Sequence, residues 1–203
     1  MSTRILLVRH GETDSNAEGR SQGRREVPLN ARGREQAASA ARVVAAFAPV
    51  AIYASTTGRA QETAGAIAGA CGLEVASDER LLELDQGDLD GLMPTEMREQ
   101  APDFLQRWAT EDPADLQMPG GESLREAQHR MLDAVRAIAA AHDGETAVAV
   151  SHNLALKALL CAVLGVELVG FRAIRLDTAS ISAIEVLDDG TLILAALNGN
   201  CHL

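Results

Sequence analysis

The fold is decided by the stretch Arg4-Ile5-Leu6-Leu7-Val8-Arg9-His10-Gly11, close to the start of the chain. Its four consecutive apolar residues are typical of a strand buried on both faces in a parallel sheet. Because ligands bind beyond the carboxyl ends of such strands, Arg9 and His10 are expected at a binding site. A second apolar run, Thr146–Val150, is followed closely by His152. The sequence therefore predicts two buried strands that each end in a histidine.

Strands and helices alternate through the first half of the chain. Asn30 can cap a helix that ends before Pro49, and Val50–Ala54 is an expected strand. The next helix is expected to begin near residues 55–57 and to end at Cys71-Gly72, since glycine favours the conformation of a C-terminal cap. This alternation is typical of a parallel sheet with crossover helices.

The second half of the chain adds helices, a strand and a hairpin. Ser123 and Glu126 have the spacing of a capping box, which opens a helix before the second histidine-bearing strand, and an apolar helix follows that strand. Ile181–Leu187 and Leu192–Leu197 flank the turn Asp188-Asp189-Gly190, so they are expected to pair as an antiparallel hairpin. We therefore expect a mixed sheet with helices on both faces.

Length, composition and charge restrict the class of protein. The 203 residues, 47% of them hydrophobic, suffice for one domain spanning residues 1–203. The net charge of −11 opposes attraction to nucleic acid or to an acidic membrane surface. No apolar run is long enough for a membrane span or a signal peptide, so a cytoplasmic protein is expected. Cys71, Cys161 and Cys201 form no CxxC pair, so we expect reduced thiols rather than disulfides or a zinc site.

The residues at the strand ends fit phosphoryl transfer, which needs a nucleophile, cations around the phosphate oxygens and a proton donor. A neutral imidazole such as that of His10 can attack phosphorus through one nitrogen when the other donates to a carbonyl. The guanidinium of Arg9 can match two phosphate oxygens. Arg59 lies in the first turn of its expected helix, where a cation is unfavourable unless an anion shares the site. Glu83 is the candidate proton donor.

Each of these residues taken alone also fits a purely structural role. A histidine at a strand end is usually structural, and the acidic loop Glu83–Asp90 is of a kind that is usually just solvated. Other phosphate-binding patterns are missing, because the sequence contains neither GxxxxGK[ST] nor GxGxxG, and no cysteine begins a CxxxxxR loop. HExxH is also missing, so a metal-free mechanism is preferred.

A set of short motifs follows in a fixed order along nearly the whole chain. The set consists of Leu7-Val8-Arg9-His10-Gly11-Glu12-Thr13, Asn16, Gly19-Arg20, Gln22-Gly23, Pro28-Leu29, Ser55 with Arg59-Ala60-Gln61-Glu62-Thr63, Leu82-Glu83 with Gly87 and Gly91, Gly120-Gly121-Glu122-Ser123, and Val150-Ser151-His152. This ordered set resembles the histidine phosphatase superfamily, the phosphoglycerate mutase-like group. The resemblance implies a phosphoglycerate mutase-like fold, a three-layer α/β/α sandwich with a mostly parallel mixed sheet.

The resemblance also implies a role for each candidate residue. His10 becomes phosphorylated, while Arg9, Arg59 and His152 hold the phosphoryl group. Glu83 is the proton donor and acceptor. No metal and no organic cofactor is implied.

Further positions are implied to contact phosphate or substrate, namely Asn16, Gln22 and Gly23. Two positions depart from the pattern of many members. Asn153 stands where glycine is common, and its side chain could add a phosphate contact or only narrow the pocket. Leu89 stands where an aromatic residue is common in the loop after the acid, so stacking against substrate there is not expected.

The expected function is hydrolysis of a small phosphorylated metabolite through a phosphohistidine on His10. A phosphoglycerate mutase stays open as an alternative, although mutases usually carry a longer insertion after the acidic loop. A metal-independent phosphoserine phosphatase is a second alternative, because Cys201-His202-Leu203 resembles the ending of those enzymes, but Gln86 stands where they typically have histidine. A module that binds a phosphorylated ligand without turnover is a third. The sequence leaves the oligomeric state open, and homodimers are common for such folds.

Overall fold

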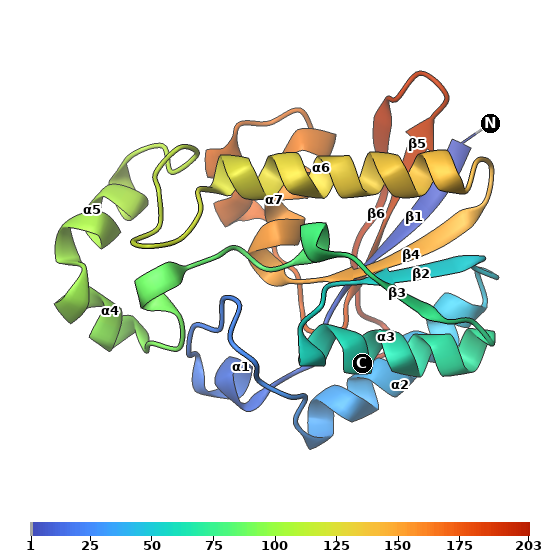
Figure 1. Ribbon diagram of the computed structural model, residues 1–203, viewed down its shortest axis with the longest axis horizontal. Helices are drawn as coiled ribbons and strands as arrows, with labels where there is room; N and C mark the ends of the chain where they lie inside the picture. Colours follow the sequence, from blue (N-terminus) through green and yellow to red (C-terminus); the bar gives the residue numbers. More distant parts are fainter. Residues whose placement is uncertain (1) are drawn as a thin grey trace.

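Across residues 2–203, which the computed structural model describes, a six-stranded mixed sheet lies between two helical layers (Figure 1). Its strands are β1 (Ser2–Arg9), β2 (Ala51–Ala54), β3 (Val75–Ser77), β4 (Thr146–Ser151), β5 (Ile181–Leu187) and β6 (Leu192–Gly199). They lie in the order β3-β2-β4-β1-β5-β6. The first four strands are parallel, and the β5–β6 hairpin runs antiparallel beside β1. The predicted mixed, mostly parallel sheet is confirmed.

The two strands that carry the histidines are neighbours at the centre of the sheet. β1 pairs with β4 in parallel, and this register sets Arg9 opposite Ser151. The main-chain N–H of His10 continues the ladder by donating to the carbonyl of Ser151 over 3.0 Å. The main chains of His10 and His152 are therefore placed side by side by strand pairing alone.

Helices cover both faces of the sheet (Figure 1). They are α1 (Asp14–Glu18), α2 (Ala31–Ala45), α3 (Gly58–Cys71), α4 (Pro94–Gln100), α5 (Pro102–Thr110), α6 (Leu124–Ala141) and α7 (Asn153–Val163), with 3-10 turns η1 (Glu79–Leu81), η2 (Gly87–Leu89) and η3 (Leu168–Ala173). Because successive strand residues point to opposite faces, Ile5 and Leu7 pack with α6 and α7, whereas Leu6 and Val8 pack with α2 and α3. The predicted three-layer sandwich is confirmed.

The predicted helix ends are formed by the residues expected to form them. The side chain of Asn30 caps α2 by accepting from the N–H of Gly33 over 2.8 Å. Gly72 ends α3 with φ of 69°, a left-handed conformation that favours glycine. Ser123 and Glu126 form the capping box at the start of α6. Local sequence therefore determines where these three helices begin or end.

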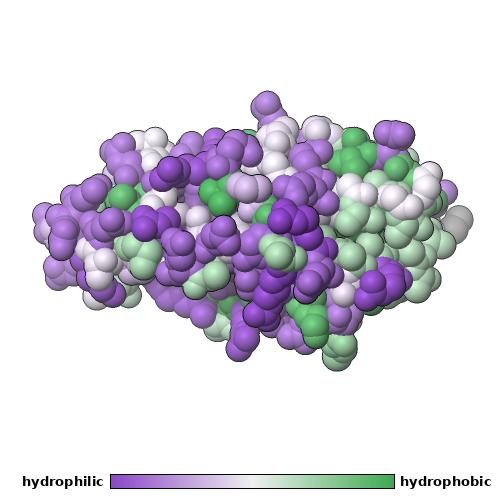
Figure 2. Space-filling view, turned by 90° about the horizontal axis from the view of Figure 1, so that it is seen from below, coloured by the Kyte–Doolittle hydropathy of each residue, from purple (hydrophilic) through white to green (hydrophobic). Residues whose placement is uncertain are grey.

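The layer formed by α2 and α3 is rich in alanine. Ala40, Ala41, Ala60 and Ala64 are buried in its core, and such small side chains let helix and sheet approach closely. Figure 2 shows the molecule from this side: hydrophilic side chains cover most of the face, and pale small apolar ones gather toward one end. No helix within residues 2–203 has both the length and the apolar character needed to cross a membrane.

Several elements were not predicted, namely α1, β3, α4, α5 and the three 3-10 turns. β3 has only three residues at the edge of the sheet. The segment of residues 94–119 was expected to be irregular because of its prolines, yet it contains α4 and α5. Pro94 and Pro102 are the first residues of these helices, where the missing N–H costs no hydrogen bond. The ring of Trp108 in α5 lies 5.7 Å from that of Phe171, which ties α5 to η3.

Candidate active site

A cavity of about 170 Å³ lies where β1 and β4 end. It is lined by Arg9, His10, Asn16, Arg20, Ser21, Gln22, Gly23, Arg59, Glu83, Gln86, Asn153 and Leu154. Every residue predicted for the site lines this cavity except His152, which lies beside His10. The fold therefore gathers in one place residues that the sequence spreads from position 9 to position 153.

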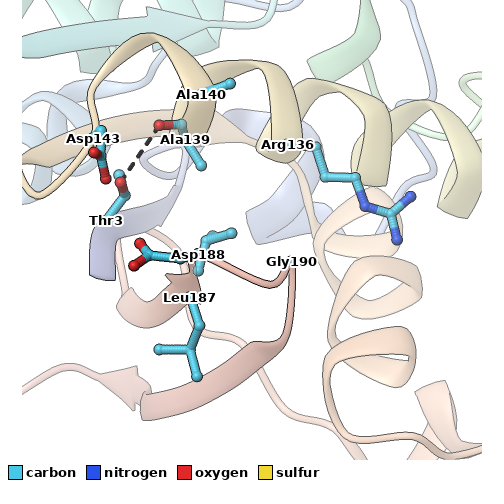
Figure 3. Close-up of a pocket in the computed structure, with 9 residues that line it drawn as sticks. Thr3, Arg136, Ala139, Ala140, Asp143, Leu187, Asp188 and Gly190 are labelled. Atoms are coloured by element: carbon cyan, nitrogen blue, oxygen red, sulfur yellow. Dashed lines mark hydrogen bonds between the residues drawn. The ribbon is translucent and has the colours of Figure 1, made fainter. Parts of the chain in front are cut away.

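A larger cavity of about 480 Å³ lies at the other end of β1, between α6 and the β5–β6 hairpin (Figure 3). Thr3, Arg136, Asp143 and Asp188 contribute its polar side chains. Figure 3 shows the guanidinium of Arg136 directed away from the two carboxylates. Its described lining contains no histidine, no cysteine and no residue predicted for catalysis, so the smaller cavity is the candidate active site.

The imidazole of His10 is buried, with 2% of the residue exposed. Its Nδ1 lies 2.7 Å from the carbonyl oxygen of Gly11, so Nδ1 carries the proton and donates, and Nε2 keeps its lone pair. Burial, assisted by the charges of Arg59 and Arg9, holds the pKa of His10 well below its ordinary value. The ring is therefore neutral at neutral pH, which is the form that can attack phosphorus.

The guanidinium groups of Arg59, which is buried, and of Arg9, which is partly buried, lie beside this imidazole. Arg59, 1% exposed, donates to the carbonyls of Gly23 and Arg25 over 2.6 and 2.7 Å. Arg9 donates to the carbonyl of Leu176 over 2.7 Å. Burial lowers the pKa of both arginines, and the charge of Glu83 opposes that shift. Main-chain carbonyls thus hold both cations in place at the cavity.

The second histidine stands next to the first. The rings of His10 and His152 have centroids 5.1 Å apart. His152 is completely buried, and its Nε2 is hydrogen bonded to the hydroxyls of Ser55 at 2.8 Å and Thr57 at 3.4 Å. Burial is the main cause that keeps the pKa of His152 well below its ordinary value, and the nearby charge of Arg59 adds to it.

Three nitrogen atoms of this cluster lack a hydrogen-bond partner among residues 2–203. They are Nε of Arg9, Nε of Arg59 and Nδ1 of His152, and all three are buried. Buried polar groups in native proteins are almost always paired. Unpaired nitrogens on two cations and an imidazole therefore point to an anion with several oxygen atoms as the ligand.

The carboxylate of Glu83 is held at the start of α7. Its Oε1 accepts from the main-chain N–H of Leu84 and of Ala155, each over 2.9 Å, and its Oε2 accepts from that of Leu154 over 3.2 Å. The residue before α7 is His152, whose own side chain does not cap the helix. The acid and the second histidine are therefore held by the same helix start, a relation that the sequence pattern did not indicate.

The predicted binding residues are connected through one hydroxyl. The single hydroxyl hydrogen of Thr13 is shared between the amide oxygen of Gln22, 2.9 Å from Oγ1, and that of Asn16, 3.1 Å from Oγ1. These bonds use the amide oxygens, so both NH₂ groups stay available as donors. Gly23 has φ of 45°, and a Cβ there would lie 1.6 Å from a carboxylate oxygen of Asp90, so only glycine fits.

Four residues line the cavity without having been assigned to it from the sequence. Arg20 donates to the carbonyl of Gly91 over 2.7 Å, the hydroxyl of Ser21 donates to the side chain of Gln86, and Leu154 follows Asn153. Gly19-Arg20 and Gln86 were noticed in the sequence, but nothing marked Ser21 or Leu154. By contrast, Leu89 packs in the core, 3% exposed, and does not reach the cavity.

Metal ligands are not grouped in the described part of the chain. Within residues 2–203, no three side chains of His, Cys, Asp or Glu come close enough together to hold a metal ion. Cys71, Cys161 and Cys201 are free thiols.

Comparison with known proteins was decisive for the family. Residues 5–198 match the sequence model of the histidine phosphatase superfamily (branch 1). The chain belongs to the histidine phosphatase superfamily. The predictions of this family, of its fold and of a phosphatase as the enzyme class are thereby confirmed.

Relatives of this histidine phosphatase carry different names. Phosphoserine phosphatase 1 of Hydrogenobacter thermophilus is 36% identical over 200 residues, which cover 98% of this chain and 94% of the relative. GpmB of Salmonella paratyphi C, named as a probable phosphoglycerate mutase, is 36% identical over 181 residues, covering 89% and 84%. The solved structure of Bacillus stearothermophilus YhfR has a TM-score of 0.91 and 35% identity, covering 98% of each chain.

Proposed function

We propose that this histidine phosphatase hydrolyses small phosphomonoesters through a phosphohistidine formed at Nε2 of His10. One observation carries the proposal: a buried, neutral imidazole with Nδ1 bonded to Gly11 lies among unpaired nitrogens of Arg9, Arg59 and His152. A nucleophile with a free lone pair and donors for the phosphate oxygens are the two requirements of phosphoryl transfer.

In the first step, Nε2 of His10 attacks phosphorus and the bond from phosphorus to the ester oxygen breaks. Glu83, protonated, gives its proton to the departing oxygen, so an alcohol leaves. Arg9, Arg59 and His152 bind the oxygens of the transferred group and stabilise the charge that they carry. The carboxylate produced on Glu83 is the form that three main-chain N–H groups stabilise, which favours this direction of proton transfer.

In the second step, water attacks the phosphohistidine. Glu83, now a carboxylate, accepts a proton from that water, and the bond from phosphorus to Nε2 of His10 breaks. Inorganic phosphate leaves, the imidazole is neutral again and Glu83 is again protonated. The enzyme thus returns to its starting state after one turnover, and the net reaction converts the phosphomonoester and water into an alcohol and inorganic phosphate.

Hydrolysis is favoured over phosphoglycerate mutation because the segment after the acidic loop does not reach the cavity. A mutase must shield its phosphohistidine from water until the phosphoryl group returns to a second hydroxyl. No residue of the segment 94–119, which holds α4 and α5, lines the cavity. Incubation with 3-phosphoglycerate tests the choice: free phosphate is expected, and formation of 2-phosphoglycerate without phosphate would establish the mutase instead.

The substrate is a small phosphorylated metabolite. A cavity of about 170 Å³ is below the range of about 300–1,000 Å³ that drug-sized ligands occupy. Phosphoserine is one candidate, because the relative from Hydrogenobacter carries that name. The presence of Gln86 in the cavity, where phosphoserine enzymes typically have histidine, speaks against it.

The location and assembly of the enzyme are also proposals. A net charge of −11 and a small metabolite as substrate support a cytoplasmic enzyme without nucleic-acid or membrane partners. A homodimer is proposed only because such folds commonly pair. Cell fractionation and analytical ultracentrifugation test the two statements separately.

A phosphatase screen with the His10→Ala variant tests the main proposal. We expect the wild type to release phosphate from several small phosphomonoesters, and His10→Ala to release none. Mass spectrometry after quenching without acid should find phosphate on His10. The exposed residue His129 supplies a control, since His129→Ala should keep full activity. An active His10→Ala variant would overturn the mechanism, and tight binding without any hydrolysis would indicate a binding module.

A further inference from the structure

Arg130, on α6, is hydrogen bonded to the main chain that leads to Glu83. Its guanidinium donates to three carbonyls of that segment: those of Arg80 over 2.8 Å, Leu82 over 2.6 Å and Glu83 over 3.0 Å. The side chain is 16% exposed, so these bonds are largely shielded from water. A planar guanidinium can serve several carbonyls at once, which a lysine ammonium cannot do with the same fixed geometry.

Glu122 holds this guanidinium in place and links it to a second arginine. Its carboxylate binds Arg130 through both oxygens and Arg24 at 3.1 Å. Arg24 in turn donates from Nε to the carbonyl of Glu83 over 3.3 Å and pairs with Asp85 at 3.2 Å. The carbonyl of Glu83 thus accepts from two arginines that share one carboxylate.

Without the hydrogen bonds from Arg130 and Arg24, the position of the Glu83 side chain would be less well defined. The Glu83 carboxylate must reach the N–H groups of Leu154 and Ala155 on one side and the leaving oxygen of the substrate on the other. The segment around it, from Leu82 to Gln86, has no regular secondary structure. A displacement of about 1 Å in catalytic groups is enough to cost about 100-fold in rate. Glu83 lies in no strand, so the strand pairing that locates His10 does not act on it; the nearest main-chain bond across to another segment runs from the N–H of Glu122 to the carbonyl of Asp85 over 3.0 Å.

We propose that Arg130, braced by Glu122, is a positioning residue that fixes the main chain at Glu83 for proton transfer to the leaving group. Arg130 does not line the cavity and touches no substrate, so it acts only through Glu83. The inference rests on the proposed role of Glu83 as the acid.

Two kinds of substrate separate proton transfer from general stability. An aryl phosphate such as p-nitrophenyl phosphate releases a weakly basic oxygen that needs little help from an acid, whereas glycerol 2-phosphate releases a strongly basic one. Arg130→Met is expected to lower kcat/KM about 100-fold for the alkyl substrate and less than about 5-fold for the aryl substrate, because general acid catalysis contributes about 10²- to 10⁴-fold. The ratio of kcat/KM values is compared because kcat/KM reports formation of the phosphohistidine and not its later hydrolysis, which is the same for both substrates.

Further variants control for damage to the fold. Arg136→Met removes the same side chain from an exposed position of α6 and should leave both rates unchanged. Arg130→Lys keeps the charge without the planar fork, so it should recover only part of the alkyl rate. If Arg130→Met does not fold, Arg130→Lys and Glu122→Gln are compared by the same ratio of alkyl to aryl rates.

Equal losses with both substrates, or no loss with either, would overturn the positioning role. Glu83→Gln shows which proposal has failed. If Glu83→Gln keeps the alkyl activity, Glu83 is not the acid and the proposed function fails. If Glu83→Gln loses the alkyl activity selectively while the Arg130 and Glu122 variants do not, only the positioning role fails.

Discussion

The two sides of the catalytic cavity are held by different forces. On the side of His10 and His152, main-chain hydrogen bonds between β1 and β4 set the positions of the residues. On the side of Glu83, hydrogen bonds from side chains set the position of the residue, since Arg130 and Arg24 both donate to the carbonyl of Glu83. We call the part of the cavity around His10 and His152 the strand side, and the part around Glu83 the loop side. Substitution of a catalytic side chain on the strand side should therefore lower activity with little loss of stability. Substitution on the loop side should lower activity and stability together.

The strongest test of the strand side is His10→Asn. We expect activity to fall by about four to six orders of magnitude, as for other catalytic nucleophiles. The asparagine NH₂ can still donate to Gly11, and the β1–β4 ladder does not involve this side chain, so thermal unfolding should change by only a few degrees. Steady-state kinetics and calorimetry measure the two quantities. A variant with a large loss of stability would show that the histidine side chain, not the ladder, holds this side.

The corresponding test of the loop side is Glu83→Gln. We expect kcat on alkyl phosphates to fall by about 10²- to 10⁴-fold. Stability should also fall, by about 1 to 2 kcal/mol, because the NH₂ group of glutamine takes the place of one of the two oxygens that accept from the N–H groups of Leu154 and Ala155, and one of these N–H groups then faces a donor. Urea unfolding measures this loss. Glu79→Gln, an exposed change in η1, is the control and should alter neither quantity. Unchanged stability in Glu83→Gln would contradict the proposed contrast between the two sides.

The same contrast explains what could be predicted from the sequence. The apolar run before Arg9 and the polar caps such as Asn30 act locally, so five of the six strands, several helix ends and the histidine positions followed from short patterns. Support of Glu83 by Arg130 joins residues 47 positions apart and depends on how α6 is rotated against the sheet. No local pattern carries that information. α4 and α5 were missed because Pro94 was interpreted as a break rather than as a helix start.

Acid should weaken the strand side through its buried histidines. His10 and His152 have pKa values well below the ordinary value of 6.5, mainly because they are buried. Below pH 6.5 the unfolded chain therefore binds protons that the folded chain does not, and folding stability falls as the pH falls. Each histidine contributes a slope of up to about 1.4 kcal/mol per pH unit.

Denaturant unfolding between pH 5 and 7.5 measures this slope. In His10→Asn, the slope should decrease by up to about 1.4 kcal/mol per pH unit, since one of the two neutral histidines is gone. His129→Asn removes an exposed histidine and should leave the slope as in the wild type. Equal slopes in all three proteins would mean that His10 has the same pKa in the folded and the unfolded chain.

The smallest expected effect concerns the hydroxyl that holds His152. Ser55→Ala removes the bond at 2.8 Å to Nε2 and leaves only the longer contact with Thr57. A neutral hydrogen bond contributes about 1 kcal/mol, so we expect about that loss of stability and about a fivefold loss of kcat/KM. Ser180→Ala is the matched control, because the buried hydroxyl of Ser180 has no partner among the described residues. If both variants behave alike, the hydroxyl of Ser55 does not position His152, and main-chain pairing alone is enough for the strand side.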